Sequence, residues 1–328
     1  MAHNNHKEML IMGLSGAKKI TESVCKYLKV KPMPTTISHF ADGEILVRPE
    51  MTVRCHRVTV IQSLTKPVNE HIMELLIAID ALKRASAEKI NVVIPYYAYA
   101  RQDRKTLGRE PITSKLLASL IERAGADRVA IVDIHSDQTQ GFFDAPVDTL
   151  KATFLTVIQA LKKMNTKNLV IVSPDYGGVK RARSIAGTLH VPLAILDKRR
   201  PIPNQAEVTN VLGDVNGKDC LISDDMIDTA GTIVAACRVL KQKGAKSITI
   251  AATHGVLSNP AVERLTKAVK EKTISNIYLT NSIESVYEKT IPNLQIVDLG
   301  KYLSEVIETY YNDHGSISKI YNHYNLRK

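Results

Sequence analysis

The chain has 328 residues, a hydrophobic fraction of 44% and a formal net charge of +11. Its length predicts two domains, at about 150 residues per domain, with enough apolar residues for a sizeable core, and no stretch approaches the ~18 uninterrupted apolar residues of a membrane span. The charge favours a polyanionic partner, either nucleic acid or phosphorylated metabolites, but Lys and Arg are spread along the chain, so charge alone does not decide between them.

The first strong pattern along the chain is a helix that leads into a strand. A strand-like run at 57–62 comes before it. Apolar residues then recur with the i, i+3, i+4, i+7 spacing of one buried helix face, at Ile72, Leu75, Leu76 and Ile79. Residues 82–94 carry the chain from the end of this helix into a strand rich in β-branched side chains.

The same helix-to-strand unit recurs. Residues 120–132 match residues 82–94 position by position in character, and a third copy, one residue shorter at the turn, runs from 240 to 250. Each copy turns at a small residue, and a glycine there suits the left-handed conformation that closes a helix. Further strand-like runs lie at 168–172, 219–223 and 276–280.

Strands that alternate with helices predict βαβ units, and therefore an α/β fold of mostly parallel sheets flanked by helices. Because the repeat occurs in both halves, we expect two similar domains, 1–150 and 151–328, with the last helix and tail packing back on the N-terminal domain. Ligands of such sheets bind beyond the carboxyl ends of the strands. The polar residues that follow each strand are therefore the candidates for a site.

The sharpest such segment is Asp224-Asp225-Met226-Ile227-Asp228-Thr229-Ala230-Gly231-Thr232. We expect a strand that ends at Ser223, followed by two carboxylates and a turn into a helix. Small residues let backbone N–H groups close round a phosphate, and the helix dipole adds partial positive charge. Carboxylates beside a phosphate suit sugar hydroxyls or a hydrated Mg²⁺. The alternative is that Asp228 and Thr229 merely cap the helix.

Three common nucleotide-binding patterns are missing from the sequence: GxxxxGK[ST], GxGxxG after a strand, and the HRD…DFG pair of kinases. The segment at 224–232 instead resembles the phosphoribosyl-pyrophosphate-binding motif of the type I phosphoribosyltransferase fold. Four other segments narrow the resemblance to the ribose-phosphate pyrophosphokinase family: NEHIMELL (69–76), PYYAYARQD (95–103), QGFFD (140–144) and DKRRP (197–201).

The resemblance implies two phosphoribosyltransferase-like domains and a defined reaction. Enzymes of this family move the β,γ-pyrophosphoryl group of Mg-ATP to the anomeric hydroxyl of ribose 5-phosphate, which gives phosphoribosyl pyrophosphate and AMP. Lys198 and Arg200 match the two basic residues of the family's catalytic loop, which are expected to stabilise charge on the β-phosphorus. His135 and Asp175 match positions linked to Mg²⁺, the implied cofactor.

The resemblance also implies two substrate sites. The ribose-5-phosphate site would comprise Arg200, Asp224, Asp225, Asp228, Thr229, Ala230, Gly231 and Thr232. The ATP site would comprise Phe40, Asp42, Gly43, Glu44, Arg101, Gln102, Asp103 and His135. In the family the phenylalanine comes from a neighbouring subunit, so we expect a homo-oligomer, for which the family suggests a hexamer.

A control site for inorganic phosphate, as an activator, is implied by the resemblance of Arg54, Ser316 and Ser318 to family residues. The sequence departs from the family pattern here, because Cys55 stands where glycine is usual and the tail beyond Tyr321 is longer.

The cysteines and the start of the chain indicate where the protein works. Cys25, Cys55, Cys220 and Cys237 have no zinc-binding spacing, which favours reduced thiols over a disulfide framework. Residues 1–20 lack the apolar core of a signal peptide. We therefore expect a cytoplasmic enzyme that binds neither membranes nor nucleic acid.

Three other readings compete with this interpretation. A phosphoribosyltransferase that consumes the same product would not need the Arg101-Gln102-Asp103 segment or a duplicated fold. A non-catalytic regulatory subunit of the family predicts damaged catalytic positions, yet Lys198 and Asp228 are present. A nucleic-acid-binding protein predicts a localised basic face and strongly salt-dependent affinity.

Overall fold

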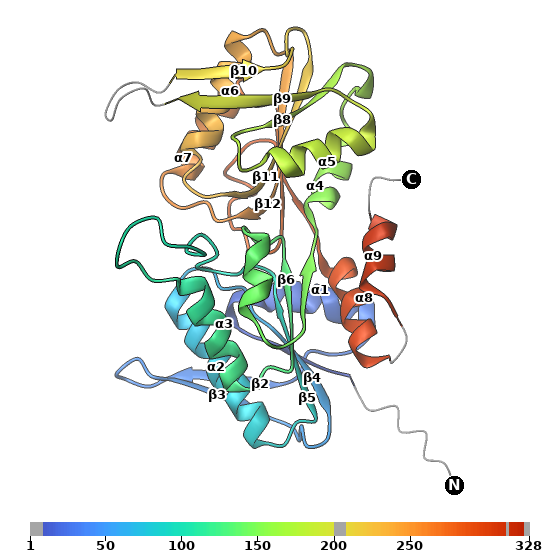
Figure 1. Cartoon of the computed structure of the whole chain (residues 1–328). Coiled ribbons are helices and arrows are strands. Elements are labelled where there is room, and N and C mark those ends of the chain that lie inside the picture. Colours follow the sequence, from blue (N-terminus) through green and yellow to red (C-terminus); the bar gives the residue numbers. More distant parts are fainter. Residues whose placement is uncertain (1–8, 200–207, 313–314, 325–328) are drawn as a thin grey trace. The chain divides into compact units, whose positions relative to one another are not determined.

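A computed structural model describes residues 9–199, 208–312 and 315–324 (Figure 1). The chain forms two compact units. The first is built from the chain up to Lys151 together with two later stretches, Ser282–Glu284 and Asp298–Tyr321. The second is built from Ala152–Asn281, Ser285–Val297 and, of the described residues near the end of the chain, 322–324. Among the described residues, no helix combines the length and the apolar character needed to cross a membrane.

The first unit contains a five-stranded parallel sheet. In spatial order its strands are β1 (Leu10–Gly13), β4 (Arg57–Ile61), β5 (Lys89–Ile94), β6 (Arg128–Val132) and β7 (Val147–Leu150). Its helices are η1 (Ser15–Ala17), α1 (Lys18–Leu28), α2 (Val68–Arg84), α3 (Thr113–Ala124), η2 (Asp137–Phe142) and α8 (Gly300–Tyr311). Helices α2 and α3 cover one face of the sheet, and α1 and α8 lie side by side on the other (Figure 1).

Burial on both faces explains why the central strands are so uniformly apolar. Val92, Val93 and Ile94 of β5 are all fully buried, as expected of a parallel strand covered by helices above and below. The face of α2 predicted from its spacing is the one that packs on the sheet, since Leu75, Ile79 and Leu82 are also fully buried. The core of the unit therefore lies between the sheet and its two helix layers.

Helix α8 joins the first unit although it is encoded near the end of the chain. Its inner face, which includes Leu303, Val306 and Ile307, is fully buried, and it packs against α1. Tyr310 donates a hydrogen bond to Asp148 at 2.9 Å and lies under the Arg128 guanidinium, 5.1 Å from the ring centroid. The C-terminal end of the helix is thus tied to strands β6 and β7.

A separate antiparallel hairpin, formed by β2 (Thr35–His39) and β3 (Ile45–Pro49), packs against α2. Its turn is closed by hydrogen bonds from the Phe40 N–H to the Glu44 carbonyl at 2.8 Å and from the Gly43 N–H to the Phe40 carbonyl at 3.0 Å. Gly43 has a φ of +93°, a conformation that glycine adopts without a Cβ clash. The turn can therefore be tight.

The second unit contains a seven-stranded sheet that is parallel except for one edge strand, β10. In spatial order its strands are β10 (Val208–Leu212), β9 (Leu193–Arg199), β8 (Leu169–Ser173), β11 (Asp219–Ile227), β12 (Ser247–Gly255), β13 (Asn276–Thr280) and β14 (Leu294–Val297). Its helices are α4 (Thr153–Leu161), η3 (Thr166–Asn168), α5 (Val179–Leu189), α6 (Gly231–Gln242) and α7 (Ala261–Lys270). Helices α4 and α5 lie on one face and α6 and α7 on the other (Figure 1). A last helix, α9, spans Ile317–Tyr324.

The α/β fold class with mostly parallel sheets flanked by helices is confirmed. One prediction about the site is wrong: β11 does not end at Ser223 but continues to Ile227. Its partner β12 is equally long, and Asp224 pairs in register with Ala252, and Met226 with His254. The ladder to β12 thus keeps Asp224 and Asp225 inside the strand, where they extend its carboxyl end.

Candidate active site

A three-residue connection joins β11 to α6, and together with the first residues of α6 it is called the cradle here. A hydrogen bond from the Leu257 N–H to the Ile227 carbonyl at 3.0 Å fixes the end of the strand. Helix α6 begins at Gly231, and Ala230 before it has a φ of +59°, in the left-handed region. The first N–H groups of a helix have no partner within it and carry its positive dipole. The arrangement can therefore hold an anion at the carboxyl edge of the sheet.

The acidic pair at the end of β11 is held by an arginine. Arg181, on α5, contacts Asp224 through Nη1 at 3.0 Å and Asp225 through Nη2 at 3.1 Å. Burial, and after it the neighbouring Asp225 carboxylate, raises the pKa of Asp224 to about 7, against the opposing effect of Arg181. Near neutral pH the two carboxylates therefore hold less than their full negative charge.

Sequence reasoning missed two residues that this geometry brings to the cradle, Arg181 and Arg264. Arg264, on α7, donates from Nη1 to the Thr229 carbonyl at 3.0 Å. Both arginines stand on helices among other basic residues, such as Lys180 and Lys267, and periodicity does not separate one from another. Only the packing of α5 and α7 on the sheet shows which guanidinium faces the loop.

The turn after β8 places Asp175 at the start of α5. Its Oδ1 accepts a hydrogen bond from the Gly178 N–H at 3.0 Å, and its carbonyl accepts one from Ser173 at 2.7 Å. Tyr176 in the same turn is 60% exposed. This turn and the cradle follow the neighbouring parallel strands β8 and β11, so both lie at the carboxyl edge of one sheet.

His135 belongs to the first unit, where it follows β6 and is exposed. Asp133, two residues before it, is buried and has a φ of +37°, a sparsely populated conformation that is often found at functional sites. Within the part of the chain that the structure describes, no group of three or more His, Cys, Asp and Glu side chains is placed to hold a metal ion. A metal bound here would therefore need ligands from water or substrate.

Of the two predicted catalytic residues, Lys198 lies on the strand next to the edge of the second sheet. Lys198 is in β9, where its backbone pairs with Thr209 of β10. The structure describes this backbone but not the Lys198 side chain, and Arg200 lies outside the described residues. Asp197, which precedes Lys198, is buried. The strand thus anchors the segment on one side.

Apart from His135, the predicted ATP residues form two segments of the first unit. Phe40, Asp42, Gly43 and Glu44 make up the hairpin turn, where Phe40 is 56% exposed rather than buried in the core. Arg101, Gln102 and Asp103 follow β5, and both the Thr113 hydroxyl and the Ser114 N–H donate hydrogen bonds to Gln102.

The residues of the predicted control site lie in two places of the first unit. Arg54 is exposed in the turn before β4. Cys55 next to it has a φ of +59°, which accounts for a preference for glycine at this position. Ser316 and Ser318 stand at the start of α9, where the Ser316 carbonyl accepts a hydrogen bond from the Lys319 N–H at 3.0 Å.

Two family models match the chain. The model described as the N-terminal domain of ribose phosphate pyrophosphokinase matches residues 9–125, and that of the phosphoribosyl transferase domain matches residues 151–286. These matches fall on the first part of the first unit and on most of the second.

Two curated proteins and one solved structure resemble the chain over most of its length. A ribose-phosphate pyrophosphokinase of Mycoplasma pneumoniae is 49% identical over 98% of this chain and 97% of its own length, and one of Mycoplasma genitalium is 54% identical over 76% of this chain and 75% of its own. The crystal structure of a phosphoribosylpyrophosphate synthetase from Mycobacterium smegmatis is 41% identical, with a TM-score of 0.87, and the match covers 94% of this chain and 100% of that one.

Proposed function

Because the chain belongs to the ribose-phosphate pyrophosphokinase family, we propose that it moves the β,γ-pyrophosphoryl group of Mg-ATP to the anomeric hydroxyl of ribose 5-phosphate. Phosphoribosyl pyrophosphate and AMP are the products. The chain is an enzyme, a transferase of the kind that makes phosphoribosyl pyrophosphate. The observation that supports this reaction most directly is the cradle between β11 and α6, where carboxylates and the first amides of a helix meet at one strand end.

In the proposed reaction the cradle binds both the phosphate group and the hydroxyl groups of ribose 5-phosphate. The phosphate accepts hydrogen bonds from the N–H groups of residues 229–232 at the start of α6. The Asp224 and Asp228 carboxylates accept hydrogen bonds from sugar hydroxyls. Held in this way, the anomeric hydroxyl oxygen attacks the β-phosphorus of ATP in line. The bond between the β-phosphorus and the oxygen that bridges it to the α-phosphorus breaks, AMP leaves with that oxygen, and the hydroxyl proton passes to solvent.

Charge spreads over the transferring oxygens in such a reaction, and the protein's contribution is mainly to neutralise it. We assign this role to Lys198 and Arg200. Lysine is a compact point charge and arginine a planar donor of paired hydrogen bonds, so the two complement each other.

The residues present fit a magnesium ion that arrives with ATP. Mg²⁺ keeps several waters and usually takes one or two protein ligands beside substrate phosphates. Asp175 offers a carboxylate at a turn of the second unit, and the side chain of His135, in the first unit, is exposed to solvent. When bound, the ion would neutralise negative charge on the phosphate oxygens.

The experiment that tests the proposed function is AMP release from ATP and Mg²⁺, measured with and without ribose 5-phosphate. Sugar-dependent AMP formation supports it. If no AMP forms at any phosphate concentration, the catalytic function fails for this chain, and a regulatory subunit of the same family becomes the better interpretation.

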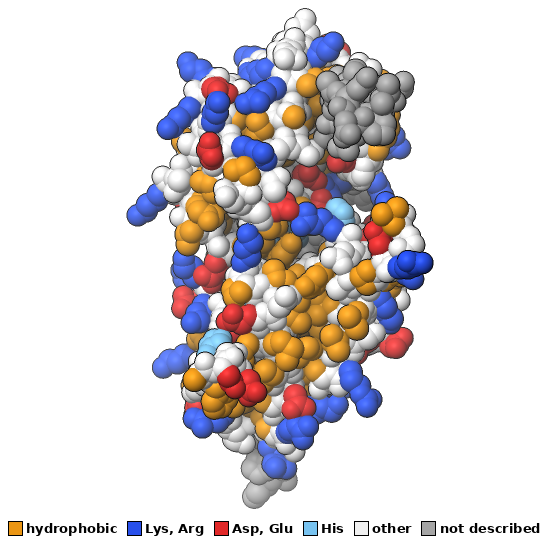
Figure 2. Space-filling model, turned by 90° about the vertical axis from the view of Figure 1, so that its left-hand side faces the viewer, with side chains coloured by type: hydrophobic (Ala, Val, Ile, Leu, Met, Phe, Trp, Pro, Cys, Tyr) orange, Lys and Arg blue, Asp and Glu red, His pale blue; other side chains and the backbone are white. Residues whose placement is uncertain are grey.

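We infer self-association from an apolar surface on the first unit. Figure 2 shows hydrophobic side chains gathered over the face that α2 and α3 form. Met73 of α2 is 49% exposed, and Leu116 and Leu120 of α3 are 56% and 41% exposed. A contiguous apolar patch on a protein surface marks an interaction site. We propose that this patch binds a second copy of the chain and that the enzyme works as a homo-oligomer in the cytoplasm. We also propose that inorganic phosphate activates the enzyme through Arg54, Ser316 and Ser318.

Leu116→Asp is expected to lower the mass of the oligomer in light scattering, because it puts a charge into an apolar interface. Asp in the first turn of α3 favours the helix, so the subunit should still fold. Val286→Asp is the matched control, since Val286 is 76% exposed in the second unit. An unchanged mass for Leu116→Asp would place the interface elsewhere.

Phe40→Ala is expected to raise KM for ATP about tenfold, because stacking on a base contributes roughly 1–3 kcal/mol. KM for ribose 5-phosphate should stay constant, and Phe40→Tyr, which keeps the ring, should behave like the native enzyme. Steady-state kinetics with each substrate varied in turn measures both. Equal losses for the two substrates would contradict an adenine-stacking role.

A further inference from the structure

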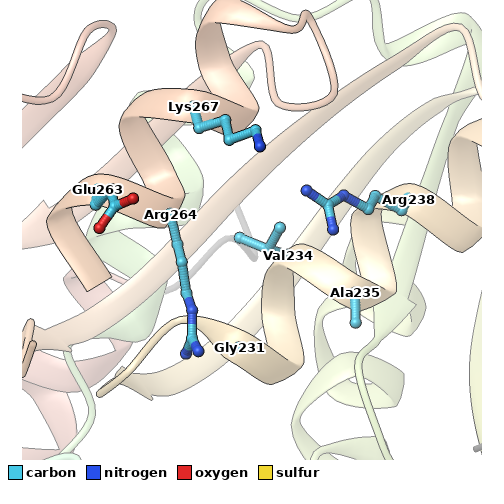
Figure 3. A pocket seen from close by; sticks show the side chains of 7 residues that line it. All are labelled: Gly231, Val234, Ala235, Arg238, Glu263, Arg264 and Lys267. Carbon is cyan, nitrogen blue, oxygen red and sulfur yellow. The ribbon is translucent and has the colours of Figure 1, made fainter. Parts of the chain in front are cut away.

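A hollow between α6 and α7 adjoins the back of the cradle, and three of the seven residues that line it are basic (Figure 3). Arg238 of α6 and Lys267 of α7 approach Glu271, at 3.8 Å and 3.9 Å. Arg264 differs from them, because it points to the start of α6 and its Nη1 contacts the Thr229 carbonyl at 3.0 Å. Of these three basic side chains, Arg264 is the one that contacts the backbone of the cradle.

The contact bears on the orientation of one peptide unit in the cradle. The Thr229 carbonyl and the Ala230 N–H belong to the same trans peptide, so they point in opposite directions. When Arg264 holds the carbonyl toward α7, the Ala230 N–H is turned away from α7. A hydrogen bond from a guanidinium to a carbonyl is stronger than one between neutral groups, and it opposes rotation of this peptide.

The peptide needs such a restraint because Ala230 is strained. Its φ of +59° lies in the left-handed region, which residues other than glycine enter at a cost. Conformations of this kind persist only where the surroundings fix them. Ala230 is itself buried, so it cannot turn freely without disturbing the packing of α6.

Gly231 makes room for the restraint. A Cβ at this position would lie 3.1 Å from the Arg264 Nη1, closer than ordinary van der Waals contact. The first residue of α6 therefore allows the guanidinium to reach across to the Thr229 carbonyl. Three features of the described chain thus converge on one peptide: the left-handed Ala230, the small Gly231 and the guanidinium of Arg264.

We propose that Arg264 is a positioning residue for ribose 5-phosphate: it holds the Thr229–Ala230 peptide so that its N–H faces the substrate phosphate. Arg264 itself touches the carbonyl on the far side of the peptide and does not contact the substrate. The inference rests on the proposed function, because it assumes that the cradle binds the phosphate of a sugar phosphate.

Arg264→Ala tests the inference, and Arg238→Ala is the matched control. Both variants remove one positive charge from the same hollow, but only the first removes the contact with Thr229. For Arg264→Ala we expect KM for ribose 5-phosphate to rise about tenfold, with kcat changed less than about threefold and KM for ATP unchanged. Arg264→Lys, which keeps a charged donor, should recover part of the loss, and Arg238→Ala should match the native enzyme.

Calorimetric titration of ribose 5-phosphate into the native chain and each variant provides a readout besides turnover. The expected result is weaker binding in Arg264→Ala alone, with melting temperatures close to that of the native chain. Unchanged ribose 5-phosphate binding in Arg264→Ala overturns the inference, as does an equal loss in Arg238→Ala or an equal rise in KM for ATP. If the native chain neither binds the sugar phosphate nor forms AMP, the proposed function itself has failed.

Discussion

Lys198→Ala is expected to lower kcat for sugar-dependent AMP formation about a thousandfold, with KM for either substrate changed only a few times. A preorganised charge that meets negative charge only in the transition state contributes to kcat rather than to ground-state binding, and losing one such group typically costs a factor of about 10²–10³ or more. The lysine stands near the end of β9, and the strand anchors its backbone beside β10.

The rate is measured as AMP release at saturating ATP, Mg²⁺ and ribose 5-phosphate. Lys243→Ala, which removes an exposed lysine from the same unit, is the control and should be fully active. Lys198→Arg should keep part of the activity if charge is the main requirement, although arginine does not reproduce a compact ammonium. A near-native kcat for Lys198→Ala would show that Lys198 has no catalytic role.

Asp224→Asn is expected to lower kcat/KM for ribose 5-phosphate about a hundredfold and, at the same time, to stabilise the fold at alkaline pH. The activity falls because a charged acceptor for a sugar hydroxyl is lost, at about 1.5–3 kcal/mol per bond. The fold gains because the native carboxyl is buried beside Asp225, and its ionised form is unfavourable there.

The sign of the pH dependence follows from the raised pKa. The carboxyl titrates near pH 7 in the folded chain and near its usual 3.8 in the unfolded chain. Between these values the folded chain binds the extra proton, so native stability falls as the pH rises. The loss of stability caused by ionising this buried carboxyl is small below about pH 4 and reaches its full value above about pH 7.

Thermal unfolding at pH 8 and pH 5 measures this effect. Asp224→Asn should raise the melting temperature by about 5 °C at pH 8 and by less at pH 5. Asp214→Asn, at an exposed position of the same unit, should change it at neither pH. A larger gain at pH 5 than at pH 8 would contradict a raised pKa for Asp224.

Much of the fold could be predicted because the central strands are apolar throughout and regularly spaced. The run predicted at 276–280 has the bounds of β13, and the run at 57–62 matches β4 to within one residue. The end of β11 could not be predicted, because Asp224 and Asp225 are typical of a loop by composition. The ladder to β12 and the contact with Arg181 hold these acids in a strand.

The candidate site was predictable where its residues are consecutive. The segment 224–232 carries its own pattern of acids and small residues, and the structure folds it into a single cradle. Arg181 lies 43 positions before Asp224 and Arg264 lies 35 positions after Thr229, and both reach the segment only through the packing of α5 and α7. No spacing rule connects residues so far apart, which explains why the sequence did not identify them.

The position of α8 sets an order on folding during synthesis. The layer that α8 forms over α1 is made from residues 300–311, which leave the ribosome after both sheets have been synthesised. The first unit therefore cannot complete its packing as it emerges, whereas the second unit needs nothing beyond Val297 for its sheet. Domains often fold in the order in which they emerge, but here the sheet of the second unit can form before the first unit completes its packing. A nascent chain that stalls near residue 297 would leave the α1 face of the first unit uncovered and open to aggregation.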